Sequence, residues 1–179
     1  MEIEKIVLLR TDECEAFIKE ANDLRNMVKL EEDPVSTLGF LGINKQLANL
    51  QAAKERLTDL LLKSITNKSN AQRLVSNAKG SYGIAYNTVM TTDVDVISQT
   101  SKEKREAAAA VKVQDDYKVL QQAEDSLAEA IVFNQVISTI AKDLENKQDL
   151  LLKQIDLIRM SMQIHPEVKD AWTANGSMN

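Results

Sequence analysis

The residues that could carry covalent or metal chemistry are few and far apart. The chain contains one histidine, His165, and one cysteine, Cys14. A zinc site built from several His and Cys ligands is therefore excluded within one chain, as is an intrachain disulfide bond. His165 precedes Pro166 and has no nucleophile near it in the sequence, so we interpret it as a helix-end histidine. We interpret Cys14 as a small apolar packing residue.

Asp93 and Asp95 bring two carboxylates close together, as a cation site would. The EF-hand pattern fails here, because it needs Gly at its sixth position and Glu at its twelfth. We interpret the pair as turn or helix-start chemistry. The sequence also lacks a Gly-rich phosphate loop ending in Lys-Ser/Thr, a GxGxxG motif and a GxSxG motif. A single histidine cannot supply the two Glu-x-x-His pairs of a di-iron site. The sequence predicts no enzyme, no metal and no cofactor.

Composition favours long helices over a sheet. Of 179 residues, 44% are hydrophobic and 27% are charged, whereas only 5 are Gly, 2 are Pro and 4% are aromatic. A sheet needs turn residues about every 8–12 positions and favours aromatic and β-branched strands. No run of about 18 apolar residues occurs, and the N-terminus lacks the pattern of a signal peptide. We therefore expect a cytoplasmic, all-α protein: an elongated antiparallel helical bundle or coiled coil without substantial sheet.

Apolar residues at three-four spacing predict where the helices lie. A first amphipathic helix is expected over about 12–30, with Thr11 as its N-cap. A break at 31–42 separates an acidic N-terminal arm, 1–35, from a long-helix domain, 36–166, and a flexible tail, 167–179, that contains Trp172. The next helix is expected over 43–90, kinked or loosened near 67–70 or 80–83. The apolar stretch 3–9 is too short to be assigned to a helix or a strand. It is the one remaining place where we allow for a strand.

A connector is expected over 90–101, rich in Thr, Ser and Asp. Thr100 and Glu103 form a capping-box pair that would begin the next helix. Asp115 and Asp116 either restart a helix or mark a shallow bend. The four alanines at 107–110 permit close approach of another helix.

The strongest periodic signal is a heptad pattern over residues 116–165. So long a helix is stable only when it packs on other helices or folds back, for which the polar patch 143–149 offers a turn. Asn134 and Gln148 occupy core slots, where they either fix register and oligomer state or lie at a wet edge. The pattern predicts a homo-oligomer, with this seam: Leu120, Leu127, Asn134, Ile137, Leu144, Gln148, Leu151, Ile155 and Ile158.

Charge is segregated along the chain, whose net charge is −5. Residues 1–35 hold 10 acidic and 5 basic residues, residues 36–113 hold 6 and 11, and residues 114–179 hold 11 and 6. No acidic residue lies between Leu60 and Thr92. A basic middle between acidic ends is compatible with nucleic-acid binding, with self-association of neighbouring subunits, or with a solvated helix face.

Cations interleaved with aromatic and amide residues are what a single-stranded nucleic-acid groove needs. Within the basic middle, tyrosines and asparagines lie in the same stretch as the cations, although Tyr82 lies on the apolar stripe and is also compatible with a core position. If the first four cations track phosphates, the salt slope should be about −0.7 per contact, or roughly −3 in total. The candidate nucleic-acid-binding residues are Lys63, Lys68, Arg73, Lys79, Tyr86, Lys102, Lys104 and Arg105.

Residues of about 100–162 carry a family resemblance. They have a Thr/Ser-capped basic start, a Tyr-Lys-x-Leu entry into a heptad helix at Tyr117, and a Leu-Ile-Arg ending at Arg159. This stretch resembles the C-terminal half of UvsY-like recombination mediators and related coiled-coil proteins of tailed phages. The resemblance implies a non-enzymatic oligomer, in the cytoplasm of a bacterial host cell, that binds single-stranded DNA, acts on the single-strand binding protein and loads a RecA-type recombinase. The acidic N-terminal arm departs from that family.

A second hypothesis stays open beside the mediator. The same helices would suit a phage or bacterial structural, assembly or inhibitor protein that works by protein–protein contacts alone. Salt-dependent binding to a labelled oligonucleotide separates the two hypotheses.

Overall fold

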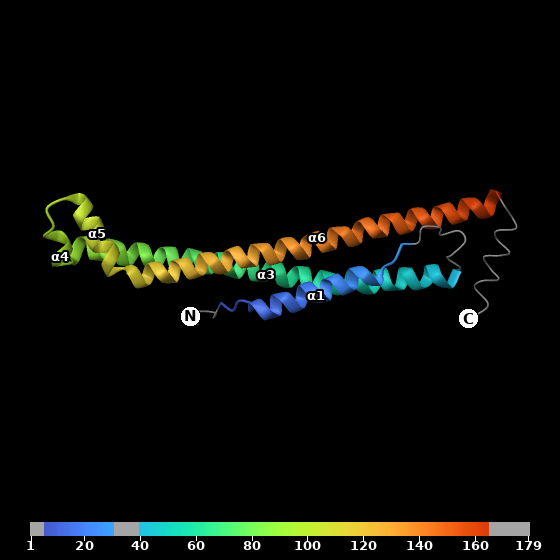
Figure 1. The fold of residues 1–179 in the computed structure, drawn as a ribbon, viewed down its shortest axis with the longest axis horizontal. Helices are drawn as coiled ribbons and strands as arrows, with labels where there is room; N and C mark the ends of the chain where they lie inside the picture. The colour runs from blue at the N-terminus through green and yellow to red at the C-terminus, as the bar shows by residue number, and fades with distance from the viewer. Residues whose placement is uncertain (1–5, 31–39, 165–179) are drawn as a thin grey trace, which may run out of the picture. The chain divides into compact units, whose positions relative to one another are not determined.

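The computed structural model describes residues 6–30 and 40–164. Within these ranges 91% of the residues are helical and no strand is present, so the predicted all-α class is confirmed. The helices are α1 (Thr11–Met27), α3 (Phe40–Thr92), α4 (Val94–Ile97), α5 (Lys102–Lys112) and α6 (Gln114–Ile164) (Figure 1). The two long helices, α3 and α6, pack antiparallel.

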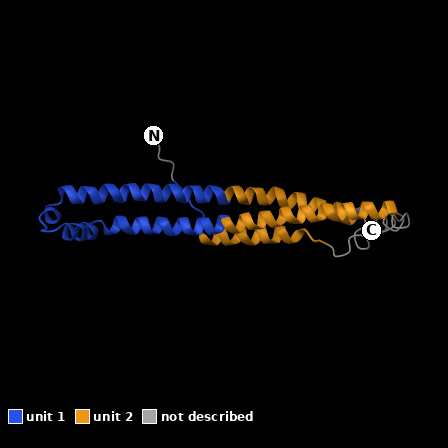
Figure 2. Cartoon of the chain, turned by 90° about the horizontal axis from the view of Figure 1, so that it is seen from above, with its two compact units in different colours: residues 1–10, 64–134 blue, residues 11–63, 135–179 orange. Residues whose placement is uncertain are grey.

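The chain divides into two compact units (Figure 2). Unit 1 comprises Met1–Arg10 and Ser64–Asn134, and unit 2 comprises Thr11–Lys63 and Gln135–Asn179. Each unit thus takes one part of α3 and one part of α6. The connection through α4 and α5 belongs to unit 1, whereas α1 belongs to unit 2.

Unit 2 is built around three helical segments. Fully buried leucines and isoleucines from α3 and α6, among them Leu60 and Leu144, fill its centre. A further cluster joins Ile43 of α3 to Ile158 of α6. Burying side chains of this size supplies about 1.5–3 kcal/mol each, which is why two amphipathic helices of this length hold together.

Side-chain bonds attach α1 to both long helices within unit 2. The Arg56 guanidinium donates to the Glu20 carboxylate, and hydrogen bonding to Glu20 raises the pKa of Arg56. Lys147 Nζ donates to the carbonyl oxygens of Arg25 at 2.9 Å and Val28 at 3.1 Å. A lysine here satisfies carbonyl groups that the end of a helix leaves without intrahelical partners. It therefore links α6 to the C-terminal end of α1.

Unit 1 has a smaller core. Val75 and Ala78 of α3 pack against Leu120 of α6. Towards the other end of the unit, the side chain of Ser64 is completely buried, and Asn134 Nδ2 donates to its Oγ at 2.9 Å. This bond satisfies polar groups that would be costly to bury alone.

The predicted helix over 43–90 exists and is not interrupted. Its observed bounds are Phe40–Thr92, and helical structure continues through 67–70 and 80–83. Asn67 is buried and bonds to Leu9, so the polar stretch there serves as a contact with another part of unit 1 rather than a break. A Cβ added at Gly80 or Gly83 would meet nothing within 4 Å, so neither glycine is required for close helix packing.

The turn considered at 143–149 does not form, because α6 continues through it. Leu144 and Leu151 lie on the buried face with 1% and 0% exposure, so a turn between them would remove one of them from the core. The charged residues of the patch have other uses, since Lys147 binds α1 and Asp143 pairs with Arg25 at 3.7 Å. The polar residues of the patch 143–149 therefore belong to the side of α6 that faces away from the apolar core.

Some predicted helix bounds differ from the observed ones, and some predicted features lie outside the residues that the structure describes. The first helix ends at Met27 rather than near residue 30, and residues 6–9 form no strand. Asp115 and Asp116 lie in the first turn of α6, so a helix does restart there. The break predicted over 31–42 is wrong for residues 40–42, which belong to α3. The part of the break with Pro34 and Gly39, His165 and the tail with Trp172 lie outside the described residues.

The predicted cap of α5 was wrong by one residue. Ser101, not Thr100, is the N-cap, with an extended backbone at φ −128° and ψ 159° and its hydroxyl accepting from the Lys104 N–H at 3.3 Å. The third helical position is then Lys104 instead of Glu103, so the reciprocal bond of a capping box has no carboxylate to make it.

We predict that Ser101→Ala destabilises α5 by about 1 kcal/mol, since an N-cap hydroxyl is worth about that much. Hydrogen exchange at the Lys104 amide measures the effect, which should be a clear loss of protection. Thr100→Ala is the control and should leave that amide unchanged. Equal losses in the two variants would contradict the assignment of Ser101 as the cap.

Candidate nucleic-acid interface

The first four predicted cations all lie on α3 but not in one unit. Lys63 belongs to unit 2, where its ammonium group stands 4.6 Å from the ring centroid of Phe17. This cation–π contact gives Lys63 a role within unit 2. Lys68, Arg73 and Lys79 belong to unit 1.

Helical periodicity sorts the cations of unit 1 into two faces. Lys68, Lys79 and Tyr86 are separated by 11 and 7 residues, which are close to three turns and two turns at about 3.6 residues per turn. They therefore share one face of α3, which we call the Lys68–Tyr86 edge. Arg73 is five residues from Lys68 and points about 140° away from it. Helical spacing on α3 thus places three of the predicted binding residues on one face and the fourth on another.

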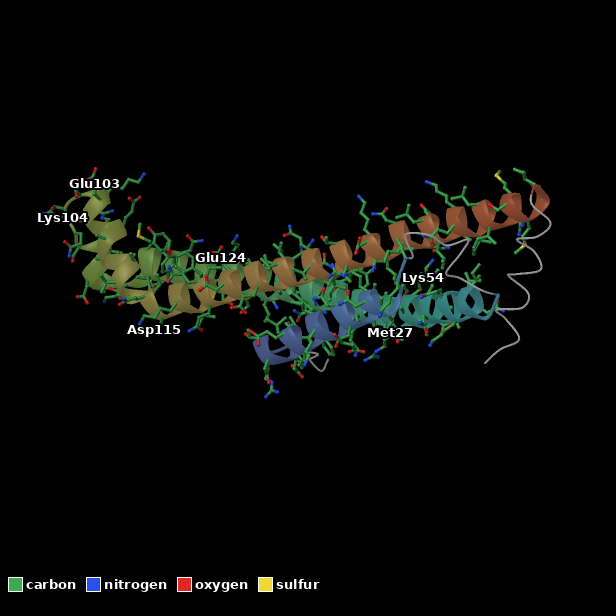
Figure 3. The ribbon with its side chains drawn as sticks, turned by 45° about the vertical axis from the view of Figure 1, so that its right-hand side comes forward. Met27, Lys54, Glu103, Lys104, Asp115 and Glu124 are labelled. Carbon is green, nitrogen blue, oxygen red and sulfur yellow. The ribbon has the colours of Figure 1, made fainter. Side chains whose placement is uncertain are left out.

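A carboxylate from α6 reaches the Lys68–Tyr86 edge. Lys79 Nζ lies 3.3 Å from Glu124 Oε1, and the two side chains are 60% and 49% exposed. Figure 3 shows Glu124 on α6. Exposed pairs of this kind add little to stability and exchange readily, so Glu124 is a competitor that an incoming phosphate would have to displace.

All three tyrosines of the chain meet in unit 1. The ring centroid of Tyr82 lies 6.1 Å from that of Tyr86 and 5.8 Å from that of Tyr117, and both ring pairs are tilted. Tyr82 packs against the core of unit 1, as one sequence interpretation expected, whereas Tyr117 is 46% exposed. Sequence spacing could not reveal this cluster, because 31 residues and two shorter helices separate Tyr86 from Tyr117.

The predicted cations of α5 are exposed, and two have partners within the chain. Lys102 lies 3.8 Å from Glu106 one turn later, and Arg105 Nε donates to the Gln99 carbonyl oxygen at 3.0 Å. The exposed side chain of Lys104 is visible beside Glu103 in Figure 3. These cations form a second basic group on unit 1.

A lysine that the sequence did not single out fastens α4 to α5. Lys112 Nζ lies 2.6 Å from Asp93 Oδ2 and 2.9 Å from Asp95 Oδ2. The hydrogen bond from Lys112 holds the pKa of Asp93 below its ordinary value, and that from the Val96 N–H acts in the same direction. Asp93 is also the N-cap of α4, so the interpretation of this carboxylate pair as helix-start chemistry is confirmed.

The predicted seam packs within the chain. Gln148 accepts a hydrogen bond from Lys54 at 2.6 Å, and Asn134 bonds to Ser64, so both polar slots have partners on α3. The homo-oligomer stays a prediction, and apolar side chains of α6 remain exposed, such as Leu157 and Ile164. The fully or nearly fully buried seam residues are Leu120, Ile137, Leu144, Leu151 and Ile158, and the half-buried ones are Leu127, Asn134, Gln148 and Ile155.

No family model matches this chain, and neither a curated protein nor a solved structure matches it. The fold is that of an all-α protein with long antiparallel helices. None of the helices in the described ranges is long and apolar enough to cross a membrane. The same ranges hold no group of three or more His, Cys, Asp or Glu side chains placed to bind a metal ion.

Proposed function

We propose that this protein is a non-enzymatic recombination mediator that binds single-stranded DNA through unit 1 and loads a RecA-type recombinase. The observation that carries the DNA-binding part is the cluster that Tyr82 and Tyr86, in the acid-free stretch of α3, form with Tyr117 of α6. Aromatic rings beside cations are the sequence-tolerant means of holding unpaired bases and their phosphates. The loading of a recombinase rests on the resemblance of residues 100–162 alone.

A strand would follow the Lys68–Tyr86 edge. Lys68 and Lys79 lie about 16 Å apart along α3, and Tyr86 lies about 10 Å further, at about 1.5 Å per residue. A strand held by the two lysines would thus reach the ring of Tyr86. The basic group of α5 would add phosphate contacts in the same unit. Although the whole protein is acidic, charges beyond about 8 Å are screened at physiological salt, so the local edge decides binding.

Salt titration of binding to a labelled 40-nucleotide single strand tests the proposal. Each lysine that neutralises a phosphate should contribute about −0.7 to the slope of log affinity against log salt. We expect Lys68→Ala and Lys79→Ala each to weaken binding and to flatten the slope by about that amount. The effect should not depend on base sequence, because phosphates carry none.

Arg73→Ala is the matched control, because it removes the same charge from the other face of α3. It should leave both affinity and slope close to those of the wild type. Equal effects of Arg73 and Lys79 would mean that net charge, not the edge, attracts DNA. Absence of binding even at about 50 mM salt, where such contacts are strongest, would overturn the mediator.

A second candidate is a structural, assembly or inhibitor protein that works by protein–protein contacts only. It is favoured by the partners that the predicted cations already have, since Lys79 pairs with Glu124 and Lys102 with Glu106. In this case the oligonucleotide titration gives no binding. The charges then serve the fold and its solubility.

A further inference from the structure

An acidic helix lies against cations of the two long helices within unit 2. This helix, α1, carries five acidic and two basic residues. The Arg56 guanidinium of α3 donates to both carboxylate oxygens of Glu20, and the Lys63 ammonium group stands over the ring of Phe17. From α6, Lys147 donates to carbonyl oxygens near the C-terminal end of α1. Three cations of unit 2 are thus engaged by α1.

The attachment of α1 depends on these polar contacts more than on an apolar core. Ala21 is the one fully buried residue of α1. The side chains of Arg56 and Glu20 are 44% and 34% exposed, and ion pairs so open to solvent add little stability and weaken as salt rises. A segment with few buried apolar contacts opens more readily than the core on which it rests. The cluster around Ile43 and Ile158 joins α3 to α6 without α1, so the two long helices keep this packing when α1 opens.

Opening of α1 would free a row of cations on α3. Arg56 and Lys63 are seven residues apart, so they share a face and lie two turns, about 10.5 Å, from each other along the helix. Guanidinium and ammonium groups are the side chains that bind phosphates. Lys63 is also one of the residues that the sequence analysis selected for nucleic-acid binding. A carboxylate-rich helix and a phosphate backbone are both anionic, so they compete for the same cations.

We propose that α1 is an autoinhibitory strap that masks a second phosphate-binding surface, formed in unit 2 by Arg56, Lys63 and Lys147. When α1 detaches, these three cations bind the backbone of a single-stranded nucleic acid. The class of ligand rests on the proposed function, whereas the masking rests on the contacts of α1 alone. Binding at this surface carries no base preference, because phosphates carry no sequence information.

A substitution at Ala21 can release the strap without adding positive charge. Ala21 is 0% exposed, so Ala21→Glu places a carboxylate in the contact between α1 and the long helices, where burial of a charge is costly. Ala16→Glu is the matched control, since it makes the same change at an exposed position of the same helix. Both variants make the protein more acidic by one charge. Net charge alone therefore predicts equally weakened DNA binding in the two variants.

Alkylation of Cys14 in the full-length chain measures detachment of α1. Cys14 is the one cysteine of the chain, is half-buried, and lies two turns from Ala21 on the same face of α1. Its rate of reaction with iodoacetamide follows access to the thiol. We expect Ala21→Glu to react about fivefold or more faster than Ala16→Glu.

Anisotropy of a labelled 40-nucleotide single strand measures the unmasked surface. We expect Ala21→Glu to bind the strand about threefold or more tightly than Ala16→Glu at low salt, although the two carry the same net charge. The slope of log affinity against log salt should be steeper by up to about 2, because three cations contribute about 0.7 each.

The two measurements separate the strap from the proposed function. Equal alkylation in Ala21→Glu and Ala16→Glu, with helices intact by circular dichroism, would overturn the strap. Faster alkylation without tighter binding would overturn the masked phosphate surface, whatever unit 1 binds. A wild type that binds no strand, beside an Ala21→Glu variant that does, would support the strap and contradict the binding edge of unit 1.

A milder pair of variants serves if Ala21→Glu does not fold. Glu20→Gln removes the ion pair with Arg56, whereas Glu15→Gln removes the same charge from an exposed position of α1. We expect Glu20→Gln to exceed Glu15→Gln both in Cys14 alkylation and in DNA affinity, by about twofold. Equal values in this pair would overturn the proposal as well.

Discussion

Replacing Leu151 with alanine is expected to lower the free energy of unfolding by about 2–5 kcal/mol, the range for a buried leucine whose cavity cannot close. Leu151 is 0% exposed in unit 2, on the face of α6 that packs within the chain. Its neighbour Leu152 is 46% exposed. Leu152→Ala should therefore cost about 0.5 kcal/mol or less, as surface substitutions do. Urea denaturation followed by circular dichroism measures both values.

The same pair of variants separates packing within the chain from packing between chains. If Leu151 stabilises a single chain, its loss should cost the same at all protein concentrations. If it lies at a seam between copies, the apparent loss depends on concentration and Leu151→Ala lowers the mass measured by light scattering. An effect of Leu152→Ala as large as that of Leu151→Ala would contradict the burial pattern of α6.

Replacing Tyr86 with alanine should weaken binding to single-stranded DNA by about 1–3 kcal/mol for each base that stacks on the ring. Because tyrosine is uncharged at neutral pH, the slope of log affinity against log salt should stay that of the wild type. Fluorescence anisotropy of a labelled oligonucleotide over a salt series gives both quantities. This prediction rests on the proposed function.

Tyr86→Phe is the control for stacking, since it keeps the ring and removes the hydroxyl. It should retain most of the affinity and preserve the ring contact with Tyr82. A thermal melt of each variant shows whether loss of that contact has loosened unit 1. Tyr86→Ala with wild-type affinity, or Tyr86→Phe with the full loss, would exclude stacking at this position.

Much of the helical framework could be predicted from local patterns. Apolar residues at three-four spacing and the scarcity of Gly and Pro account for the presence of the long helices, because each depends on a neighbour three or four residues away. The capping of α5 was missed by one residue, since Thr100 and Ser101 are both good caps and only the structure shows that the Ser101 hydroxyl accepts from the Lys104 N–H. The heptad pattern that contains Leu144 and Leu151 could be recognised in the sequence, but the helix against which it packs could not.

The candidate interface was less accessible to sequence reasoning. The acid-free stretch and Tyr86 were visible in the sequence. The contribution of Tyr117 and the pairing of Lys79 with Glu124 depend on how α6 returns along α3, which the sequence does not give. The different direction of Arg73 follows from helical spacing alone, which the grouping of the cations by charge did not use.

The sequence by itself determined that this protein is helical, where its long helices run and which of their side chains are apolar, because helix formation is governed by periodicity over a few residues. Only the tertiary structure decided which surface buries each apolar stripe. Leu120 meets Val75 and Ala78 of the same chain, and Ser64 receives the hydrogen bond of Asn134, although 70 residues separate them in sequence. A heptad stripe is equally satisfied by any complementary helix, in the same chain or in another, so its partner follows from the three-dimensional path of the chain and not from the repeat.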